Sequence, residues 1–200
     1  MLKQDDQLVI ASHNQGKIHE IKLLLEPFNL NVISATDLGV PEPEETGATF
    51  IENSVLKAVE VMKHCNLPCL ADDSGLAIDD LNGDPGVYSA RWAQKQDGTR
   101  DFRIAYDRIF QILDPHQPHK AHFVCVLTLA FPDGRIHSFE GQIHGHVSLP
   151  ARGEYGFGYD PIFTPEGYSQ TFAEMEKDFK QGISHRHYAF EKLKQFLRQA

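Results

Sequence analysis

The sequence predicts an α/β fold. The N-terminal segment favours this class of fold, because the apolar run at residues 8–11 has the length of a strand and is followed by a loop and a helical pattern over residues 18–28. A second observation is the apolar run "AHFVCVLTLAF" at residues 121–131, which is typical of a buried strand. The 200 residues, 41% of them hydrophobic, fit one compact domain over residues 1–200 with a buried core.

The elements between these two runs follow in order. Residues 31–34 predict a second strand, and residues 41–47 form a Pro/Glu-rich loop. The run "TFIE" at residues 49–52 has the capping-box pattern, so a helix is expected to begin there. The apolar stripe of this helix is expected to face the core, which leaves Asn53 and Lys57 on the opposite side.

The second half of the chain predicts the remaining elements. Residues 69–73 predict a strand that ends in an acidic segment, and residues 103–113 predict an amphipathic helix. The run at residues 135–148 completes a hairpin with the strand at residues 121–131. A closing helix is expected to carry on one face Ala189, Leu193, Phe196 and Leu197.

Composition narrows the class of protein. The formal net charge of −9 disfavours a nucleic-acid-binding surface, which needs a basic excess. No apolar run is long enough to span a membrane, and the first residues, "MLKQDDQLVI", lack the pattern of a secretory signal, so a cytoplasmic location is expected. Three cysteines, Cys65, Cys69 and Cys125, have no zinc-type spacing and are expected to be reduced and buried.

Candidate phosphate-binding residues follow the first strand. The segment "SHNQGK" stands at the head of the first helix and comprises Ser12, His13, Asn14, Gln15, Gly16 and Lys17. Its backbone N–H groups, polar side chains and lysine can bind an anion at the positive end of that helix. The segment is not a Walker A loop, and an ordinary turn capped by Asn14 explains it equally well.

The acidic segment "LADDSGLAIDDLNGDPG" covers residues 70–86. The segment does not fit an EF-hand calcium loop, because Pro85 stands where that loop needs glycine. The later aspartates are therefore expected in turns. Asp72 and Asp73 should point to opposite faces at the end of a strand, where one carboxylate can hold Mg²⁺ beside substrate phosphates. A solvated strand end is the alternative. The run "EETG" at residues 44–47 is a source of a second carboxylate.

Two later segments offer groups that suit a nucleobase. In "GFGYDP", at residues 156–161, the glycines permit close approach of a flat ligand, and Phe157 or Tyr159 can stack on it; a packed turn is the alternative. Lys180 and the run "SHR" at residues 184–186 add donors, although the serine of that run also fits a helix N-cap.

The ordered set of motifs resembles one known family. The segments "SHNQGK", "EETG", "TFIENSVLKA", "LADDSGLAIDDLNGDPGVYSARWA", "GFGYDPIF" and "ISHR" resemble the inosine/xanthosine triphosphate pyrophosphatases over residues 10–189. The resemblance implies an elongated mixed β-sheet flanked by helices, two lobes with a central active-site cleft, and a homodimer. It also implies hydrolysis of ITP, dITP or XTP to the nucleoside monophosphate and pyrophosphate with Mg²⁺, which removes these non-standard purine nucleotides from the pool.

The resemblance also implies roles for individual residues. Residues 12–17 are implied to bind the triphosphate and Ser74 to touch the substrate. Glu45 and Asp73 are implied to serve the metal, with Asp73 as the catalytic base. The implied base pocket comprises Phe157, Gly158, Tyr159, Asp160, Lys180, His185 and Arg186.

Two other interpretations stay open. A metal-dependent nucleotide hydrolase of different base specificity would use the same acidic residues with another pocket, and a non-catalytic nucleotide-binding module would use the same loops without turnover.

The sequence also departs from the family, which frequently has glycine where His13 and His187 stand. Lys57 is a further candidate to neutralise phosphate charge.

Overall fold

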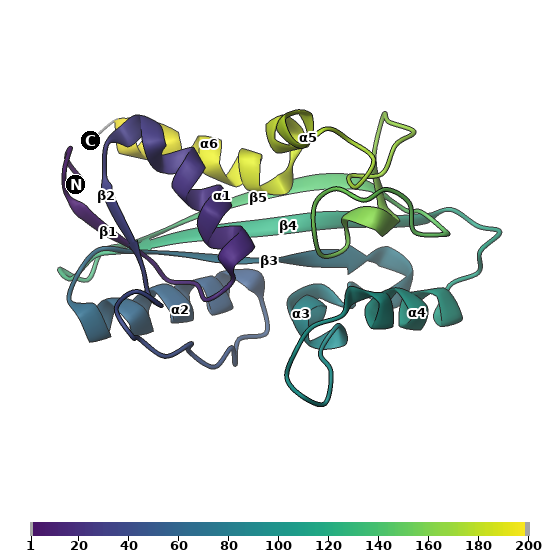
Figure 1. Cartoon of the computed structure of the whole chain (residues 1–200), viewed down its shortest axis with the longest axis horizontal. Coiled ribbons are helices and arrows are strands. Elements are labelled where there is room, and N and C mark those ends of the chain that lie inside the picture. The colour runs from purple at the N-terminus through teal and green to yellow at the C-terminus, as the bar shows by residue number, and fades with distance from the viewer. Residues whose placement is uncertain (1, 199–200) are drawn as a thin grey trace. The chain divides into compact units, whose positions relative to one another are not determined.

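The computed structural model describes residues 2–198, which form a six-stranded sheet with flanking helices (Figure 1). The strands are β1 (Gln7–Ile10), β2 (Asn31–Ser34), β3 (Cys69–Ile78), β4 (His119–Ala130), β5 (Ile136–Val147) and β6 (Phe163–Pro165). The α-helices are α1 (Gln15–Leu25), α2 (Phe50–Cys65), α3 (Ser89–Trp92), α4 (Phe102–Ile112), α5 (Lys177–Ile183) and α6 (His185–Arg198). The strand order is β2-β1-β3-β4-β5-β6. Because β1 is parallel to β2 and β3 while β5 is antiparallel to β6, the predicted mixed sheet is confirmed.

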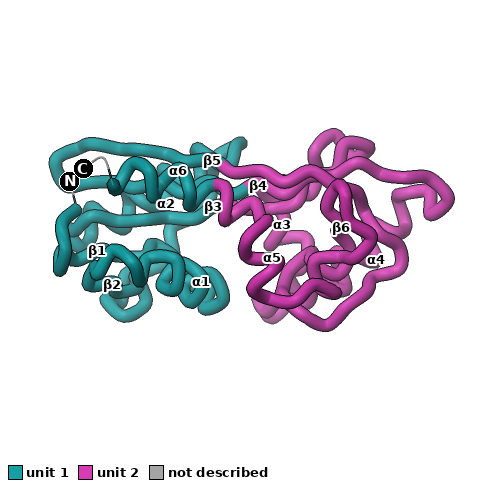
Figure 2. The backbone as a smooth tube through the Cα atoms, turned by 90° about the horizontal axis from the view of Figure 1, so that it is seen from above, with its two compact units in different colours: residues 1–73, 125–140, 189–200 teal, residues 74–124, 141–188 magenta. Residues whose placement is uncertain are grey.

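The chain divides into two compact units (Figure 2). Unit 1 comprises Met1–Asp73, Cys125–Glu140 and Ala189–Ala200, and unit 2 comprises Ser74–Val124 and Gly141–Tyr188. The division falls within β3, between two consecutive residues of the acidic segment. The single domain expected over residues 1–200 remains a prediction.

Unit 1 buries both faces of its part of the sheet. Leu70 of β3 packs with apolar residues of α1 and α6, whereas Cys69 packs with α2 on the opposite face (Figure 1). Parallel strands that helices cover on both sides are apolar along their whole length, which explains the runs that predicted these strands. Since side chains alternate along a strand, Asp72 follows Leu70 toward α1 and Asp73 follows Cys69 toward α2.

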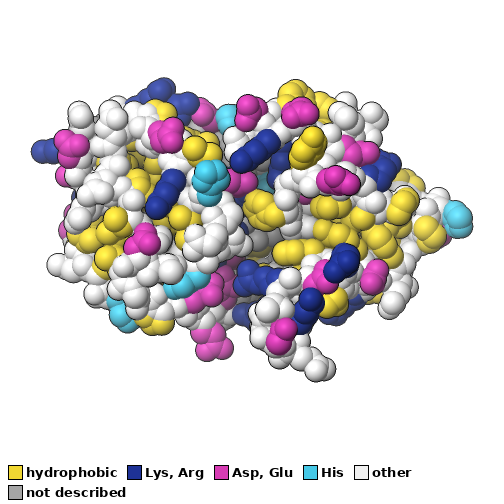
Figure 3. Space-filling model, in the orientation of Figure 1, with side chains coloured by type: hydrophobic (Ala, Val, Ile, Leu, Met, Phe, Trp, Pro, Cys, Tyr) yellow, Lys and Arg dark blue, Asp and Glu magenta, His cyan; other side chains and the backbone are white. Residues whose placement is uncertain are grey.

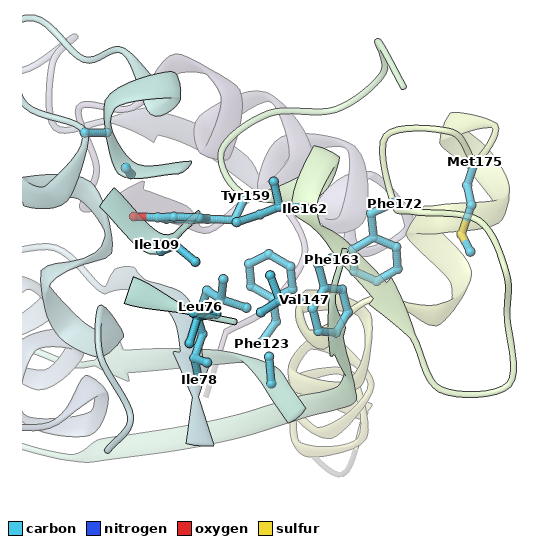
Figure 4. Close-up of a cluster of buried hydrophobic side chains, with 14 residues drawn as sticks. Leu76, Ile78, Ile109, Phe123, Val147, Tyr159, Ile162, Phe163, Phe172 and Met175 are labelled. Carbon is cyan, nitrogen blue, oxygen red and sulfur yellow. The ribbon is translucent and has the colours of Figure 1, made fainter. Parts of the chain in front are cut away.

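Unit 2 has its own core, which is rich in aromatic rings (Figure 4). The Phe123 ring of β4 lies 4.7 Å from the Phe163 ring and 6.0 Å from the Phe172 ring, measured between centroids. Apolar residues of α4 and the Tyr159 ring complete this core. The burial of Tyr159 fixes the segment at residues 156–161 against the interior of unit 2.

The length of β3 differs from the sequence prediction. The strand was expected to end at residue 73, but it continues to Ile78 because Leu76 and Ile78 are buried in the core of unit 2. Asp72 and Asp73 therefore lie within a strand and are buried, so the alternative of a solvated strand end is wrong. The turn expected for the later aspartates is confirmed.

One face of the molecule carries charges of both signs. On the face shown in Figure 3, Lys and Arg side chains are interspersed with Asp and Glu. Positive charge for an anionic ligand must therefore come from individual lysines and arginines at the site. Within residues 2–198, no helix has both the length and the apolar character needed to cross a membrane.

His119, the first residue of β4, connects two loops of unit 2. Its Nδ1 lies 2.5 Å from Asp80 Oδ2, and its Nε2 lies 2.7 Å from the carbonyl oxygen of Asp114. Both partners are acceptors, so both ring nitrogens must carry hydrogen and the side chain is an imidazolium. The hydrogen bond to Asp80 raises the pKa of His119 above its ordinary value.

We expect this contact to make the stability of the protein depend on pH. Because the pKa of His119 is raised from 6.5 by folding, the stabilisation is complete below that pH and is lost as pH rises through the folded-state pKa. Asp80→Asn should lower the melting temperature at about pH 6 and change it little at about pH 9. Thermal unfolding followed by circular dichroism measures both differences. The exposed Asp84→Asn variant is the control, and an Asp80→Asn effect of equal size at both pH values would contradict the assignment.

Candidate active site

Three charged side chains of unit 1 meet beside β3. Lys57 Nζ, on α2, lies 2.6 Å from Glu45 Oε1 and 2.8 Å from Asp73 Oδ1. Lys57 and Asp73 are almost fully buried, so solvent and salt screen this attraction only weakly. One ammonium group therefore bridges two carboxylates that are 28 positions apart in the sequence (residues 45 and 73).

The buried face of α2 differs from the one predicted. Asn53 and Lys57 were expected on the exposed side, yet both are buried while Ile51 is 45% exposed. Each buried polar group has a partner, since Asn53 Oδ1 accepts a hydrogen bond of 2.7 Å from the Gly47 N–H. A Cβ atom on Gly47 would lie 2.7 Å from that same oxygen, so glycine is required there. The predicted capping box at the start of α2 is confirmed.

Asp72 points away from Asp73 and binds a lysine of α1. Lys17 Nζ lies 2.6 Å from Asp72 Oδ1, and the Cys125 thiol donates a hydrogen bond of 3.2 Å to Asp72 Oδ2. The side chain of Asp72 is fully buried. The opposite orientation predicted for Asp72 and Asp73 is confirmed, and each carboxylate has its own lysine.

Residues 12–17 form the turn between β1 and α1. Asn14 caps the helix, because its Oδ1 accepts a hydrogen bond of 3.2 Å from the Lys17 N–H, and Ser12 Oγ accepts one from the Asn14 N–H. His13 Nε2 lies 2.8 Å from the carbonyl oxygen of Val40, so this nitrogen carries the proton. The cap predicted as the alternative is present, and the first turn of α1 still offers helix N–H groups to an anion.

The environment of Asp73 suits a carboxylate that binds a cation. Burial raises the pKa of Asp73 above its ordinary value, although Lys57 and Lys17 attract its charged form. Its Oδ2 is buried and has no hydrogen-bond partner among residues 2–198. With Glu45, it gives two carboxylates for the single ammonium group of Lys57, so a hard divalent cation suits this charge. Within residues 2–198, no group of three or more His, Cys, Asp or Glu side chains is arranged to hold a metal ion.

Asp160 organises the loop at residues 156–161 in unit 2. Its Oδ2 accepts hydrogen bonds of 2.8 Å from the Phe157 N–H and 2.5 Å from Lys180 Nζ. A Cβ atom on Gly156 would lie 2.1 Å from the same oxygen, and the positive φ of 76° at this position also requires glycine. Lys180 Nζ lies 5.3 Å from the centroid of the Phe157 ring. The loop therefore presents one aromatic ring beside one buried cation.

The two aromatic rings of this loop differ in availability. Phe157 is 40% exposed, whereas Tyr159 is buried and donates a hydrogen bond of 2.8 Å to the Ser89 carbonyl oxygen. The Tyr159 ring belongs to the core of unit 2, so Phe157 is the more accessible of the two rings, and stacking of either ring on a ligand stays a prediction. Tyr106 of α4 donates a hydrogen bond to the Gly158 carbonyl oxygen and so holds the backbone of the loop in place. The sequence pattern did not predict this role for Tyr106.

The remaining candidates lie together in unit 2. Arg186 Nη2 donates a hydrogen bond of 3.2 Å to Ser74 Oγ, and the His185 ring stacks on Phe123 at 4.7 Å with an interplanar angle of 11°. Ser184 Oγ accepts a hydrogen bond of 3.1 Å from the His187 N–H, so the predicted N-cap of α6 is confirmed. Both His185 and Arg186 are buried at the start of this helix, where they hold fixed donor positions.

The chain is similar to known proteins along nearly its whole length. Residues 8–196 match the model of the Ham1 family. The chain is 50% identical over 198 residues to the dITP/XTP pyrophosphatase of Agrobacterium fabrum, and the match covers 92% of each chain. It is 47% identical over 199 residues to the dITP/XTP pyrophosphatase of Rhizobium meliloti, and this match covers 93% of each chain. The solved structure of a HAM1 protein from Coxiella burnetii has a TM-score of 0.89 at 37% identity, over 98% of this chain and 100% of that one.

Proposed function

The chain belongs to the Ham1 family, and we propose that it hydrolyses ITP, dITP and XTP to the nucleoside monophosphate and pyrophosphate. The observation that carries the proposal is that Lys57 contacts both Glu45 and Asp73, while Asp73 Oδ2 is buried and has no donor among residues 2–198. A carboxylate held beside fixed positive charge suits the attack of water on a phosphoanhydride. The names of the relatives from Agrobacterium fabrum and Rhizobium meliloti support the choice of substrate class. Such hydrolysis keeps non-standard purines out of DNA and RNA.

The residues of unit 1 are proposed to act on the triphosphate. Glu45 and Asp73 would hold Mg²⁺, which when bound neutralises charge on the phosphate oxygens. Lys17 and Lys57 add positive charge, and an ammonium about 4 Å from a phosphate contributes on the order of 4 kcal/mol in a surface-like dielectric. Asp73 orders the attacking water and accepts its proton as the water oxygen bonds to the α-phosphorus. The bond between the α-phosphorus and the bridging oxygen breaks, and pyrophosphate leaves.

The residues of unit 2 are proposed to recognise the base. The exposed face of Phe157 can stack on a purine, and Lys180, His185 and Arg186 carry N–H donors that suit the 6-oxo group of hypoxanthine and xanthine. Adenine has a donor at that position and would leave these groups unpaired. A site that holds buried donors for one substrate can discriminate by up to ~10⁴ to 10⁵ against the other.

A nucleotide panel tests the proposed function. We expect pyrophosphate release from ITP, dITP and XTP, far less from ATP, which lacks the 6-oxo group, and from dUTP, which is not a purine nucleotide, and none without Mg²⁺. GTP keeps the 6-oxo group, so its rate measures whether the pocket also distinguishes position 2 of the purine. Pyrophosphate and orthophosphate are assayed separately, with each nucleotide measured with and without the metal. Orthophosphate as the first product, or a preference for dUTP, would contradict the proposal. Binding of ITP without turnover would indicate the non-catalytic module instead.

Two further parts of the proposal concern the setting in which the protein works. We propose that two copies of the chain form a homodimer, on the family resemblance, and light scattering during size-exclusion chromatography measures the mass that decides it. We also propose a cytoplasmic location, where nucleotide pools are found. The free thiols of Cys65, Cys69 and Cys125 support a reducing compartment.

A further inference from the structure

Two cysteines of unit 1 lie side by side where α2 meets β3. Cys65 is the last residue of α2 and Cys69 the first of β3, and their Sγ atoms are 3.6 Å apart. Cys69 is fully buried, but Cys65 is only partly buried, which differs from the expectation that all three cysteines are buried. The sequence spacing gave no hint of this pair, because the proximity arises from the reversal of the chain over the three residues between them.

The thiol pair and the Lys57–Asp73 ion pair link the same two elements. Lys57 precedes Cys65 by eight residues of α2, and Asp73 follows Cys69 by four residues of β3. At 1.5 Å per helical residue and 3.3 Å per strand residue, both spans are about 12 to 13 Å. Cys69 and Asp73 lie on the same face of β3, because residues separated by an even number share a face. The helix and strand are thus joined by two contacts, one of sulfur atoms and one of charges.

We propose that Cys65 and Cys69 are a thiol-modification site that closes to a reversible intramolecular disulfide, and that closure slows hydrolysis by displacing Lys57 relative to Asp73. The oxidant is a low-molecular-weight disulfide such as glutathione disulfide. The first half of the proposal depends only on the thiols. The second half, the effect on hydrolysis, rests on the proposed function.

The reaction consists of two thiol–disulfide exchanges. Cys65 is the more accessible thiol and loses its proton to solvent, and its thiolate attacks the oxidant, breaks the S–S bond and releases one glutathione thiolate. Burial raises the pKa of the Cys69 thiol, so this residue reacts second. Its thiolate attacks the Cys65 sulfur and releases the second glutathione thiolate. The two protein thiols are oxidised to one disulfide, the oxidant is reduced to two thiols, and the two released protons are taken up by them.

We expect closure of the disulfide to move the end of α2 and the start of β3. A disulfide bond is about 2.05 Å long, so the two sulfur atoms must approach each other by about 1.5 Å from their present separation. We infer that part of this movement is transmitted along the hydrogen-bonded backbones of α2 and β3 over the roughly 12 to 13 Å to the ion pair. A misplacement of about 1 Å at catalytic groups can lower turnover by up to about 10²-fold, and we expect a decrease of about tenfold here.

The test uses the full chain incubated with glutathione disulfide, followed by alkylation and mass spectrometry. We expect the free thiols to fall from three to one, with Cys125 the thiol that remains and a cross-link between Cys65 and Cys69. Dithiothreitol should restore all three thiols and the turnover of ITP. The thiol count is independent of any nucleotide, so it would stand even if the panel overturned the proposed function.

The matched variant is Cys65→Ser, which keeps a small side chain and removes the first thiol. In glutathione disulfide, this variant should form no cross-link and should keep its rate of ITP turnover. The turnover rate of the wild-type chain should fall about tenfold under the same conditions. Persistent alkylation of Cys65 and Cys69, or a stable glutathione adduct on Cys65, would overturn the modification site. A complete cross-link with unchanged turnover, or an equal loss in Cys65→Ser, would overturn the effect on hydrolysis.

Discussion

Asp73→Asn should lower kcat for ITP hydrolysis by at least about 10³-fold, since general-base catalysis alone contributes ~10² to 10⁴ and the proposed metal loses a ligand as well. Asparagine has nearly the shape of aspartate, but it neither accepts the proton of the attacking water nor supplies negative charge for Mg²⁺. In this variant Lys57 keeps its ion pair with Glu45, whose Oε1 lies 2.6 Å from Lys57 Nζ, so the buried ammonium group still has a carboxylate partner. Steady-state assays of pyrophosphate release measure the effect.

The stability of this variant distinguishes a catalytic from a structural role. Burial raises the pKa of Asp73, so the ionised carboxylate opposes folding above the pKa it has in the unfolded chain. Asp73 also raises the pKa of Lys57, so its loss removes an attraction that stabilises the folded chain. Because these two effects oppose each other, we expect Asp73→Asn to melt close to the temperature of the wild-type chain at neutral pH. Asp5→Asn makes the same charge change at an exposed position of unit 1 and should leave kcat unaltered. Loss of activity that merely follows unfolding would remove Asp73 from the chemistry.

The strands and helices that were predicted well are those whose cause is local. The capping box at the start of α2 is one such element, because the Thr49 and Glu52 side chains satisfy backbone groups within the same turn. The bounds predicted for β2 are those observed. By contrast, the end of β3 was misplaced, because the burial of Leu76 and Ile78 depends on the core that surrounds them in unit 2.

The candidate site was predicted only where the alternation of a strand determines it. Opposite orientations for Asp72 and Asp73 follow from the period of two, and the structure confirms them. Periodicity failed on α2, because it assigns every polar residue to the outside, whereas Lys57 is buried against two carboxylates from elsewhere in the chain. The contact between Tyr106 and Gly158 joins residues 52 positions apart and has no signature in the sequence.

Asp160→Asn should destabilise unit 2 and weaken substrate binding. Lys180 is buried, and removal of one partner from a buried ion pair typically costs about 3–5 kcal/mol because the other charge stays desolvated. For a chain of this size, about 3 kcal/mol corresponds to a decrease in melting temperature of about 6–12 °C. The Phe157 N–H can still donate to the asparagine oxygen, so this hydrogen bond of the loop is kept. Thermal unfolding measures this loss.

The kinetic consequence follows from which groups the variant disturbs. Lys180 and Phe157 are proposed to bind the base, whereas water attack is assigned to Asp73, so KM for ITP should rise about tenfold or more while kcat changes little. Asp178→Asn, an exposed position on α5, carries the same charge change and should alter neither KM nor the melting temperature. An equal effect of both variants would reduce the role of Asp160 to net charge. A fall in kcat at constant KM would mean that the order of this loop is needed in the transition state itself, and the separation of base recognition from phosphate chemistry would then fail.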